Sequence, residues 1–214
     1  MKLNSFQLKC IAIITMVIDH MGAVLFPEYL LFRYVGRISF PIFCFLLVEG
    51  FFYTRNVKKY MLRLGMFALL SEIPYDLAFR EEYLEFTRQN VFFTLCIGVA
   101  MMYAVSQTNN QTIKVTYVLL AMWAAQFVAS DYGYKGILLI AIYYFCRENL
   151  IAKITLGSFW NFIWNASIQG YGAISSVFIG LYNGQKGKSM KYIFYVFYPV
   201  HLLILHVISV IVIK

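Results

Sequence analysis

The chain has 214 residues, of which 61% are hydrophobic and only 13% are charged. Soluble domains average roughly 45–50% apolar and about 25% charged residues, so this composition excludes an ordinary soluble domain and predicts a membrane protein. The formal net charge of +8 would suggest a nucleic-acid partner on a soluble protein. Here the basic residues cluster in short loops, so membrane topology explains the charge better and we expect no nucleic-acid binding.

The first apolar run, residues 8–26, lacks a small-residue cleavage site after it, so we expect it to be retained as a membrane span. Further apolar runs, separated by polar clusters, predict an all-α, polytopic bundle of about nine transmembrane helices (eight to ten). After the first run, the expected spans are residues 37–53, 60–79, 91–105, 114–129, 134–146, 150–164, 170–182 and 192–213. No internal repeat or second domain is visible, so residues 1–214 are predicted to form a single transmembrane domain.

The distribution of basic residues predicts that the N-terminus is cytoplasmic. With that orientation, cytoplasmic segments hold twelve of the 18 basic residues. The other six are Arg33, Arg37, Arg80, Arg88, Lys135 and Lys214. Because Lys and Arg accumulate in short cytoplasmic loops, this excess supports the N-in topology.

The first span carries an acid and an imidazole side by side, Asp19 and His20. Ionisable groups inside a bilayer cost at least a few kcal/mol each, so such a pair predicts a functional site. Asp19 is expected to hold the imidazole in one tautomer and leave His20 as a general base. The alternative is that Asp19 forms an interhelical salt bridge, for instance with Arg37, and His20 only hydrogen-bonds nearby.

The second predicted span begins with Arg37 near the level of His20 and ends with Glu49 toward the cytoplasmic side. Glu49 is either a second acid of the site or the partner of basic residues near position 55 or 63. The densest basic cluster follows, with Arg55, Lys58, Lys59 and Arg63. These residues suit the phosphates of coenzyme A, but positive-inside topology also demands them.

Glu72 and Asp76 are four residues apart in the third span and therefore share one helix face, with Pro74 between them to bend the helix. They either bind a cationic group or lock helices together through ion pairs. Asn90 opens the fourth span as an interhelical hydrogen-bond former.

In the last span, Tyr198 and His201 share a face, and Pro199 between them is expected to bend the helix. His201 and His206 point about 140° apart and are not expected to bind a metal together. The cysteines show no metal-binding or disulfide spacing, so we expect them to be small core residues and the protein to hold no metal. They are Cys10, Cys44, Cys96 and Cys146.

Several motifs along almost the whole chain match one family. They are residues 8–12 (LKCIA), 16–22 (MVIDHMG), 36–45 (GRISFPIFCF), 49–51 (EGF), 54–56 (TRN), 60–64 (YMLRL), 71–76 (SEIPYD), 89–94 (QNVFFT), 181–184 (LYNG) and 197–202 (FYPVHL). The chain resembles the TraX family of integral membrane proteins, named for the conjugation protein that N-acetylates F-type pilin. That family is distantly similar to membrane acyltransferases that use acyl-CoA.

The resemblance implies an acetyl-CoA-dependent acetyltransferase of the bacterial inner membrane, working among membrane lipids on a peptide or glycan acceptor. By that similarity His20 is the catalytic base, assisted by Asp19 and Arg37. Arg55, Lys58 and Arg63 are expected to bind the donor. The residues expected to contact the acceptor are Glu49, Glu72, Tyr75, Asp76, Asn90, Tyr198 and His201.

Two other classes of function fit the same residues. Intramembrane acids and a histidine also serve a proton- or cation-coupled transporter or channel. No paired broken segments of a repeat-built transporter are visible, which counts against that class. An assembly scaffold with purely structural salt bridges is the third possibility, and the sequence leaves open whether the acceptor is a peptide, a sugar or a lipid.

Overall fold

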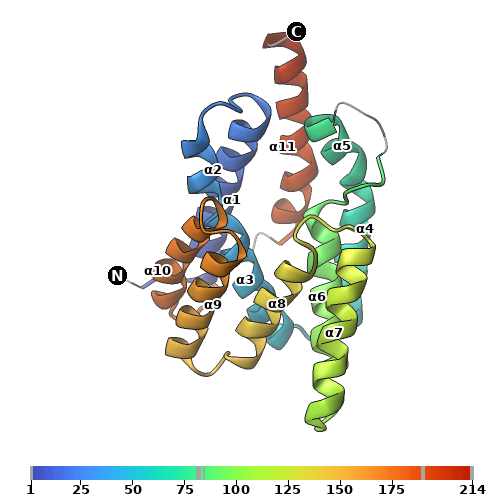
Figure 1. The fold of residues 1–214 in the computed structure, drawn as a ribbon, viewed down its shortest axis with the longest axis vertical. Helices are drawn as coiled ribbons and strands as arrows, with labels where there is room; N and C mark the ends of the chain where they lie inside the picture. Colours follow the sequence, from blue (N-terminus) through green and yellow to red (C-terminus); the bar gives the residue numbers. More distant parts are fainter. Residues whose placement is uncertain (1, 81–82, 84, 189–190, 213–214) are drawn as a thin grey trace.

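The computed structural model describes residues 2–80, 83, 85–188 and 191–212. Within these residues there is no strand, only two isolated backbone bridges, so the all-α prediction is confirmed. Figure 1 shows the helices. They are α1 (Ser5–Val24), α2 (Leu30–Gly36), α3 (Ser39–Tyr53), α4 (Val57–Leu70), α5 (Glu72–Arg80), α6 (Val91–Ser106), α7 (Gln111–Phe127), α8 (Gly133–Phe145), α9 (Leu150–Trp164), the 3-10 helix η1 (Gln169–Ile174), α10 (Ser175–Gly180) and α11 (Lys191–Val212). Residue 213, the last of the predicted span 192–213, and Lys214, one of the six basic residues predicted on the outer side, lie outside the described residues.

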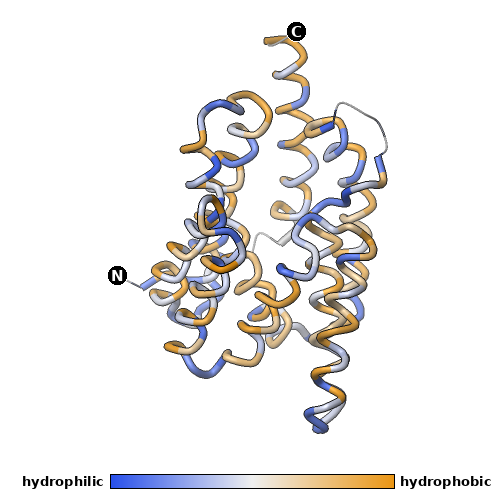
Figure 2. The backbone as a smooth tube through the Cα atoms, viewed as in Figure 1, coloured by the Kyte–Doolittle hydropathy of each residue, from blue (hydrophilic) through white to orange (hydrophobic). Residues whose placement is uncertain are grey.

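Three helical segments of the described chain are long and apolar enough to cross a membrane: Ser5–Val24, Leu30–Tyr53 and Ile193–Val212. Shorter apolar helices accompany them, so the number of crossings stays a prediction. Figure 2 shows that apolar residues dominate the helices, whereas hydrophilic residues gather at turns such as the one between α6 and α7. Large apolar side chains on the outside, for example Trp123, Phe127 and Ile211, suit contact with lipid acyl chains.

The second predicted span begins earlier than expected. The sequence predicted its start at Arg37, but the helical run begins at Leu30 and has only a two-residue break between α2 and α3. Arg33 therefore lies inside a helix rather than in a loop. The break falls at Arg37 because Pro41 has no N–H to donate to the carbonyl four residues before it.

The third predicted span is broken into α4 and α5, as a proline-containing helix is expected to be. The break follows Leu70, four residues before Pro74. The proline cannot hydrogen-bond to the carbonyl of Leu70 and its ring clashes with that group, so α4 ends there. The bend turns α5 toward α11, with which it packs.

The central element is α3, whose buried side chains contact α1, α6, α8 and α10. Phe40 and Phe45 of α3 and Tyr143 of α8 are among the largest fully buried side chains. The last helix, α11, packs against α1, α4 and α5, and its final turns project beyond the rest of the bundle in Figure 1. Helices α1, α3, α4 and α11 thus surround the space that holds the candidate site.

Candidate functional site

His20 of α1 and His201 of α11 form a hydrogen-bonded pair. The Nδ1 atom of His20 lies 2.7 Å from Nε2 of His201, although the two residues are 181 positions apart. The Nδ1 atom of His201 lies 2.8 Å from the carbonyl oxygen of Phe197, one turn earlier in α11. Phe79 and Tyr198 pack edge-on against the His20 ring, so the imidazole is held between α1, α5 and α11.

Asp19 is the centre of an ion cluster with α2. Arg33 donates to the Asp19 carboxylate (2.9 Å) and to its backbone carbonyl (3.0 Å). Arg37 donates to the same Oδ2 atom of Asp19. The salt bridge between Asp19 and Arg37, one of the two alternatives that the sequence left open, is therefore present.

The expected contact between Asp19 and the His20 imidazole is not formed. Consecutive helix residues point about 100° apart, so the carboxylate faces α2 while the imidazole faces α11. The hydrogen-bond partner of His20 is His201. The prediction that Asp19 sets the tautomer of His20 is therefore wrong for this geometry, and that position is taken by a histidine.

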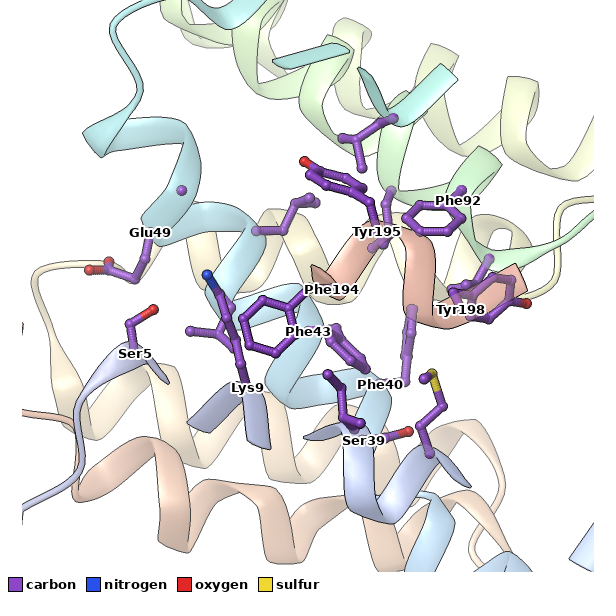
Figure 3. Close-up of a pocket in the computed structure, with 18 of the residues that line it drawn as sticks. Ser5, Lys9, Ser39, Phe40, Phe43, Glu49, Phe92, Phe194, Tyr195 and Tyr198 are labelled. Carbon is purple, nitrogen blue, oxygen red and sulfur yellow. The ribbon is translucent and has the colours of Figure 1, made fainter. Parts of the chain in front are cut away.

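A cavity of about 530 Å³ runs from His20 to the N-terminal end of α1. We call it the inner cavity, because the predicted topology puts its far end on the cytoplasmic side. Ser5, Lys9 and Glu49 lie at that end and Phe40 and Tyr198 at the other (Figure 3). Phe43 and Phe194 line the middle, so the passage is apolar between two polar ends.

The far end of the inner cavity is strongly basic. Its lining includes Lys9 of α1, Arg63 of α4, and Lys186 and Lys188 of the loop before α11. We call these four residues the basic mouth. Within the described part of the chain, the buried Nε atom of Arg63 has no hydrogen-bond partner. A phosphate-bearing ligand would satisfy that donor and neutralise the cluster.

Backbone hydrogen bonds hold the two lysines of the loop beside α1. The N–H of Leu3 donates to the carbonyl of Leu181 (2.8 Å), and the N–H of Ser5 donates to that of Gln185 (2.8 Å). Gly187 has a φ of +66°, a conformation that favours glycine, and packs against the Asn4 side chain that caps α1. The loop therefore brings its positive charges next to Lys9.

A second cavity, larger in volume, opens on the opposite side of His20, and we call it the outer cavity. Polar and aromatic side chains line it, among them Arg33, Arg37, Arg88, Tyr75 and Trp164. Arg88 pairs with Asp131 in the loop between α7 and α8 (2.7 Å). Burial raises the pKa of the Asp131 carboxyl above its ordinary value, although the Arg88 guanidinium opposes this shift.

The two cavities meet at four residues that line both of them: Asp19, His20, Asp131 and Tyr132. Tyr132 is stacked on Phe40 of α3, with ring centroids 3.4 Å apart. His20 is the histidine of this set, and its side chain is half-buried. Asp19 and Asp131 are held in ion pairs, so the His20 imidazole is the potential base of this set that ligands can meet from either side.

Comparison with known proteins agrees with the motifs. The sequence model of the family described as TraX protein matches residues 5–209, almost the whole chain. The chain belongs to the TraX family. It is 29% identical over 232 aligned positions to "Probable fimbrial assembly protein FimC, serogroup H1" of Dichelobacter nodosus, covering 94% of each protein. It is 27% identical over 133 positions to "Uncharacterized protein RP591" of Rickettsia prowazekii (strain Madrid E), covering 59% of this chain and 49% of that one. No solved structure matches it.

This TraX-family chain brings some of the predicted donor-binding residues to the site and leaves others out. Arg63 lines the inner cavity, but Arg55 and Lys58 line neither cavity. Glu49 lines the inner cavity and pairs with Arg147 (2.9 Å), not with a residue near position 55 or 63 as the sequence suggested. The sequence missed Lys9, Lys186 and Lys188 as site residues because they lie in separate segments that only the fold joins.

The predicted acceptor-contacting residues divide in the same way. Tyr75 lines the outer cavity and Tyr198 the inner one, while His201 reaches the site through His20. The structure places the other three away from both cavities, in helix-locking contacts. Glu72 accepts hydrogen bonds from the backbone and side chain of Asn90, and Asp76 accepts one from the backbone N–H of Glu85 (2.9 Å).

Proposed function

We propose that the protein is a membrane acetyltransferase that moves an acetyl group from acetyl-CoA in the inner cavity to an acceptor in the outer cavity. The observation that carries this proposal is that His20 lines both cavities. A transferase of this kind needs one base within reach of both substrates, which the meeting point provides. We further propose that it works in the bacterial inner membrane, where acetyl-CoA is available on the cytoplasmic side.

The basic mouth is our proposed binding site for the phosphates of acetyl-CoA. Lys9 and His20 are eleven positions apart in α1, which corresponds to about 16 Å along the helix. A donor whose phosphates stay at the mouth therefore has to reach His20 through an extended arm. The apolar passage lined by Phe43 and Phe194 suits such an arm, and a cavity of about 530 Å³ lies within the usual size of ligand pockets.

The proposed chemistry balances with His20 as the only proton carrier. An acceptor amine attacks the thioester carbonyl, and His20 Nε2 takes the proton that the nitrogen loses. The carbon–sulfur bond then breaks, the thiolate of CoA takes the proton back from His20, and the acceptor leaves as an amide. Arg37, whose buried Nε has no hydrogen-bond partner in the described chain, supplies positive charge on the acceptor side for the oxyanion.

For the acceptor we propose the N-terminal amine of a pilin or a similar peptide. The Dichelobacter relative is named a probable fimbrial assembly protein, and that name supports an extracellular-fibre subunit as substrate. The volume of the outer cavity, about 1480 Å³, exceeds that of a usual small-molecule pocket and therefore suits the end of a polypeptide better than a small metabolite. Transfer to a sugar or lipid hydroxyl would use the same base and is an outcome of the test below.

The test uses full-length protein in nanodiscs with acetyl-CoA as donor. The expected results are that acetyl-CoA raises the unfolding temperature, and that a synthetic peptide with a free N-terminus becomes acetylated while one with a blocked N-terminus does not. His20→Gln should keep the thermal stabilisation by acetyl-CoA and lose transfer by at least about 100-fold. Retained transfer in purified His20→Gln protein would overturn the assignment.

The competing transporter function predicts a different pattern. It requires ion-dependent uptake into proteoliposomes and no stabilisation by acetyl-CoA. The hydrogen-bonded pair favours the enzyme, because it ends at the carbonyl of Phe197, which accepts a hydrogen bond but passes no proton onward.

A further inference from the structure

We propose that His201 is a positioning residue that fixes His20 in the tautomer with a bare Nε2 atom. This inference rests on the proposed function, since it assigns a partner to the proposed base. Its starting point is the unbroken line of three groups formed by the Phe197 carbonyl, the His201 imidazole and the His20 imidazole.

The direction of both hydrogen bonds follows from the carbonyl. A carbonyl oxygen only accepts, so the Nδ1 atom of His201, 2.8 Å from the oxygen of Phe197, carries the proton and donates it. A neutral imidazole has one N–H, so Nε2 of His201 is an acceptor. The Nδ1 atom of His20, 2.7 Å away, must then be the donor. That leaves the Nε2 atom of His20 with a free lone pair.

The surroundings favour this single arrangement. His201 is buried, and the ring of Phe197 is stacked on it with centroids 5.1 Å apart. Tyr198 packs edge-on against both imidazoles. Within the described residues no hydrogen bond reaches Nε2 of His20, and the residue lines both cavities. The bare nitrogen is therefore the one left for a substrate.

Asp19, the residue next to the base, does not compete for this role. Its Oδ2 atom accepts from Arg33 of α2 and from Arg37, which directly follows α2, so the carboxylate is engaged with two cations on another face. When His20 takes a proton during transfer, the new imidazolium donates from Nδ1 to a neutral imidazole. His201 thus stabilises the charged form by a hydrogen bond, without the stronger field of a carboxylate.

Nitrogen-15 NMR tests the tautomers directly, because the chain contains only three histidines. The experiment uses the full chain in nanodiscs with ¹⁵N-labelled histidine, and His206→Asn removes the third signal pair. Both remaining imidazoles should carry the proton on Nδ1, whereas free neutral histidine in water favours Nε2–H. A proton on Nε2 of His20 overturns the inference, whatever the protein's activity.

Variants at position 201 separate positioning from mere packing. His201→Gln places an amide oxygen near the former Nε2 atom, where it accepts from His20 and keeps the tautomer. His201→Leu removes the acceptor. With acetyl-CoA and a free-amine peptide as probes, we expect Leu to lower kcat at least about 100-fold with unchanged KM for acetyl-CoA, and Gln to stay within about tenfold of wild type.

The matched control is His206→Leu, on the same helix and facing another direction, which should leave kcat unchanged. Wild-type kcat in His201→Leu, or an equal loss in Gln and Leu, overturns the inference. If the wild-type protein shows both Nδ1–H tautomers but transfers no acetyl group, the arrangement of the pair stands and the proposed function fails.

Discussion

The backbone of Gly36 in α2 lies directly against the carboxylate of Asp19 in α1. A Cβ atom added at Gly36 would come within 2.1–2.4 Å of three side-chain atoms of Asp19, closer than real Cβ contacts. Gly22 makes a similar approach to Phe32 from the other helix. These two glycines let α1 and α2 pack closely enough for Arg33 and Arg37 to reach the buried acid.

We predict that Gly36→Ala destabilises the protein by roughly 1–3 kcal/mol, the usual cost of overpacking, because the helices must separate or Asp19 must move. The measurement is thermal or denaturant unfolding in detergent. Gly180→Ala at the end of α10 is the matched control, since nothing lies within 4 Å of a Cβ there. A wild-type melting temperature for Gly36→Ala would contradict the close approach.

Replacing Asp19 should lower the free energy of unfolding more than replacing His20. Asp19→Asn leaves the partly buried guanidiniums of Arg33 and Arg37 without a counter-ion, and breaking a buried pair costs about 3–5 kcal/mol. Unfolding measurements should show that loss, whereas His20→Gln should unfold close to wild type.

The control is Glu148→Gln. The Glu148 carboxylate is exposed, and its partner Arg147 still pairs with Glu49 in the variant, so we expect a change in the free energy of unfolding below about 0.5 kcal/mol. Equal stability of the Asp19 and Glu148 variants would refute the cluster's structural role.

Local sequence patterns predicted most helices because apolar runs and polar turns are local signals. They failed at Arg33, which looked like a loop residue within an apolar stretch. Its charge is tolerated in α2 only because Asp19 of another helix accepts its hydrogen bonds. Asp19 is only 14 positions away, but the contact depends on how the chain turns back between α1 and α2, which the periodicity of a single apolar run does not specify.

For the candidate site, the sequence likewise identified the central residue but not its tertiary partner. His20 stood out because an ionisable group in an apolar run is costly. Its partner was misassigned because Asp19 is adjacent in sequence, whereas helix geometry turns adjacent side chains apart and brings His201 from the far end of the chain. Glu72 and Asp76 looked like a binding pair by spacing alone, and their hydrogen bonds to Asn90 and Glu85 only became visible in the fold.

Glu72 is predicted to stabilise the fold and not to bind substrate. Its Oε1 atom accepts from the backbone N–H of Asn90 (3.0 Å) and from the Asn90 side chain, which caps α6. Glu72→Ala leaves these buried donors short of an acceptor, so we expect a loss of about 1–3 kcal/mol in unfolding measurements. Glu72→Gln keeps an acceptor oxygen and should lose less.

Acetyl-CoA affinity and peptide KM of both Glu72 variants should equal those of the wild type, because Glu72 and Asn90 line neither cavity. A weakened substrate affinity at unchanged stability would restore the original interpretation of Glu72 as a binding residue.

The basic mouth yields a prediction that needs no known acceptor. Lys186→Glu and Lys188→Glu each replace a cation that lines the inner cavity with an anion. Loss of one charge-assisted contact is worth about 1.5–3 kcal/mol at most and less at a solvated mouth, so we expect half-maximal thermal stabilisation to need about tenfold more acetyl-CoA. Lys58→Glu, in the neighbouring basic cluster but outside both cavities, is the matched control.

A truncated donor without phosphates, S-acetyl-N-acetylcysteamine, should bind wild type and variants alike, since it has no phosphate for the basic mouth to bind. If charge reversal weakened both donors equally, the lysines would be acting on the shape of the cavity and not on phosphate. If Lys58→Glu were as harmful as Lys186→Glu, the effect would come from general surface charge.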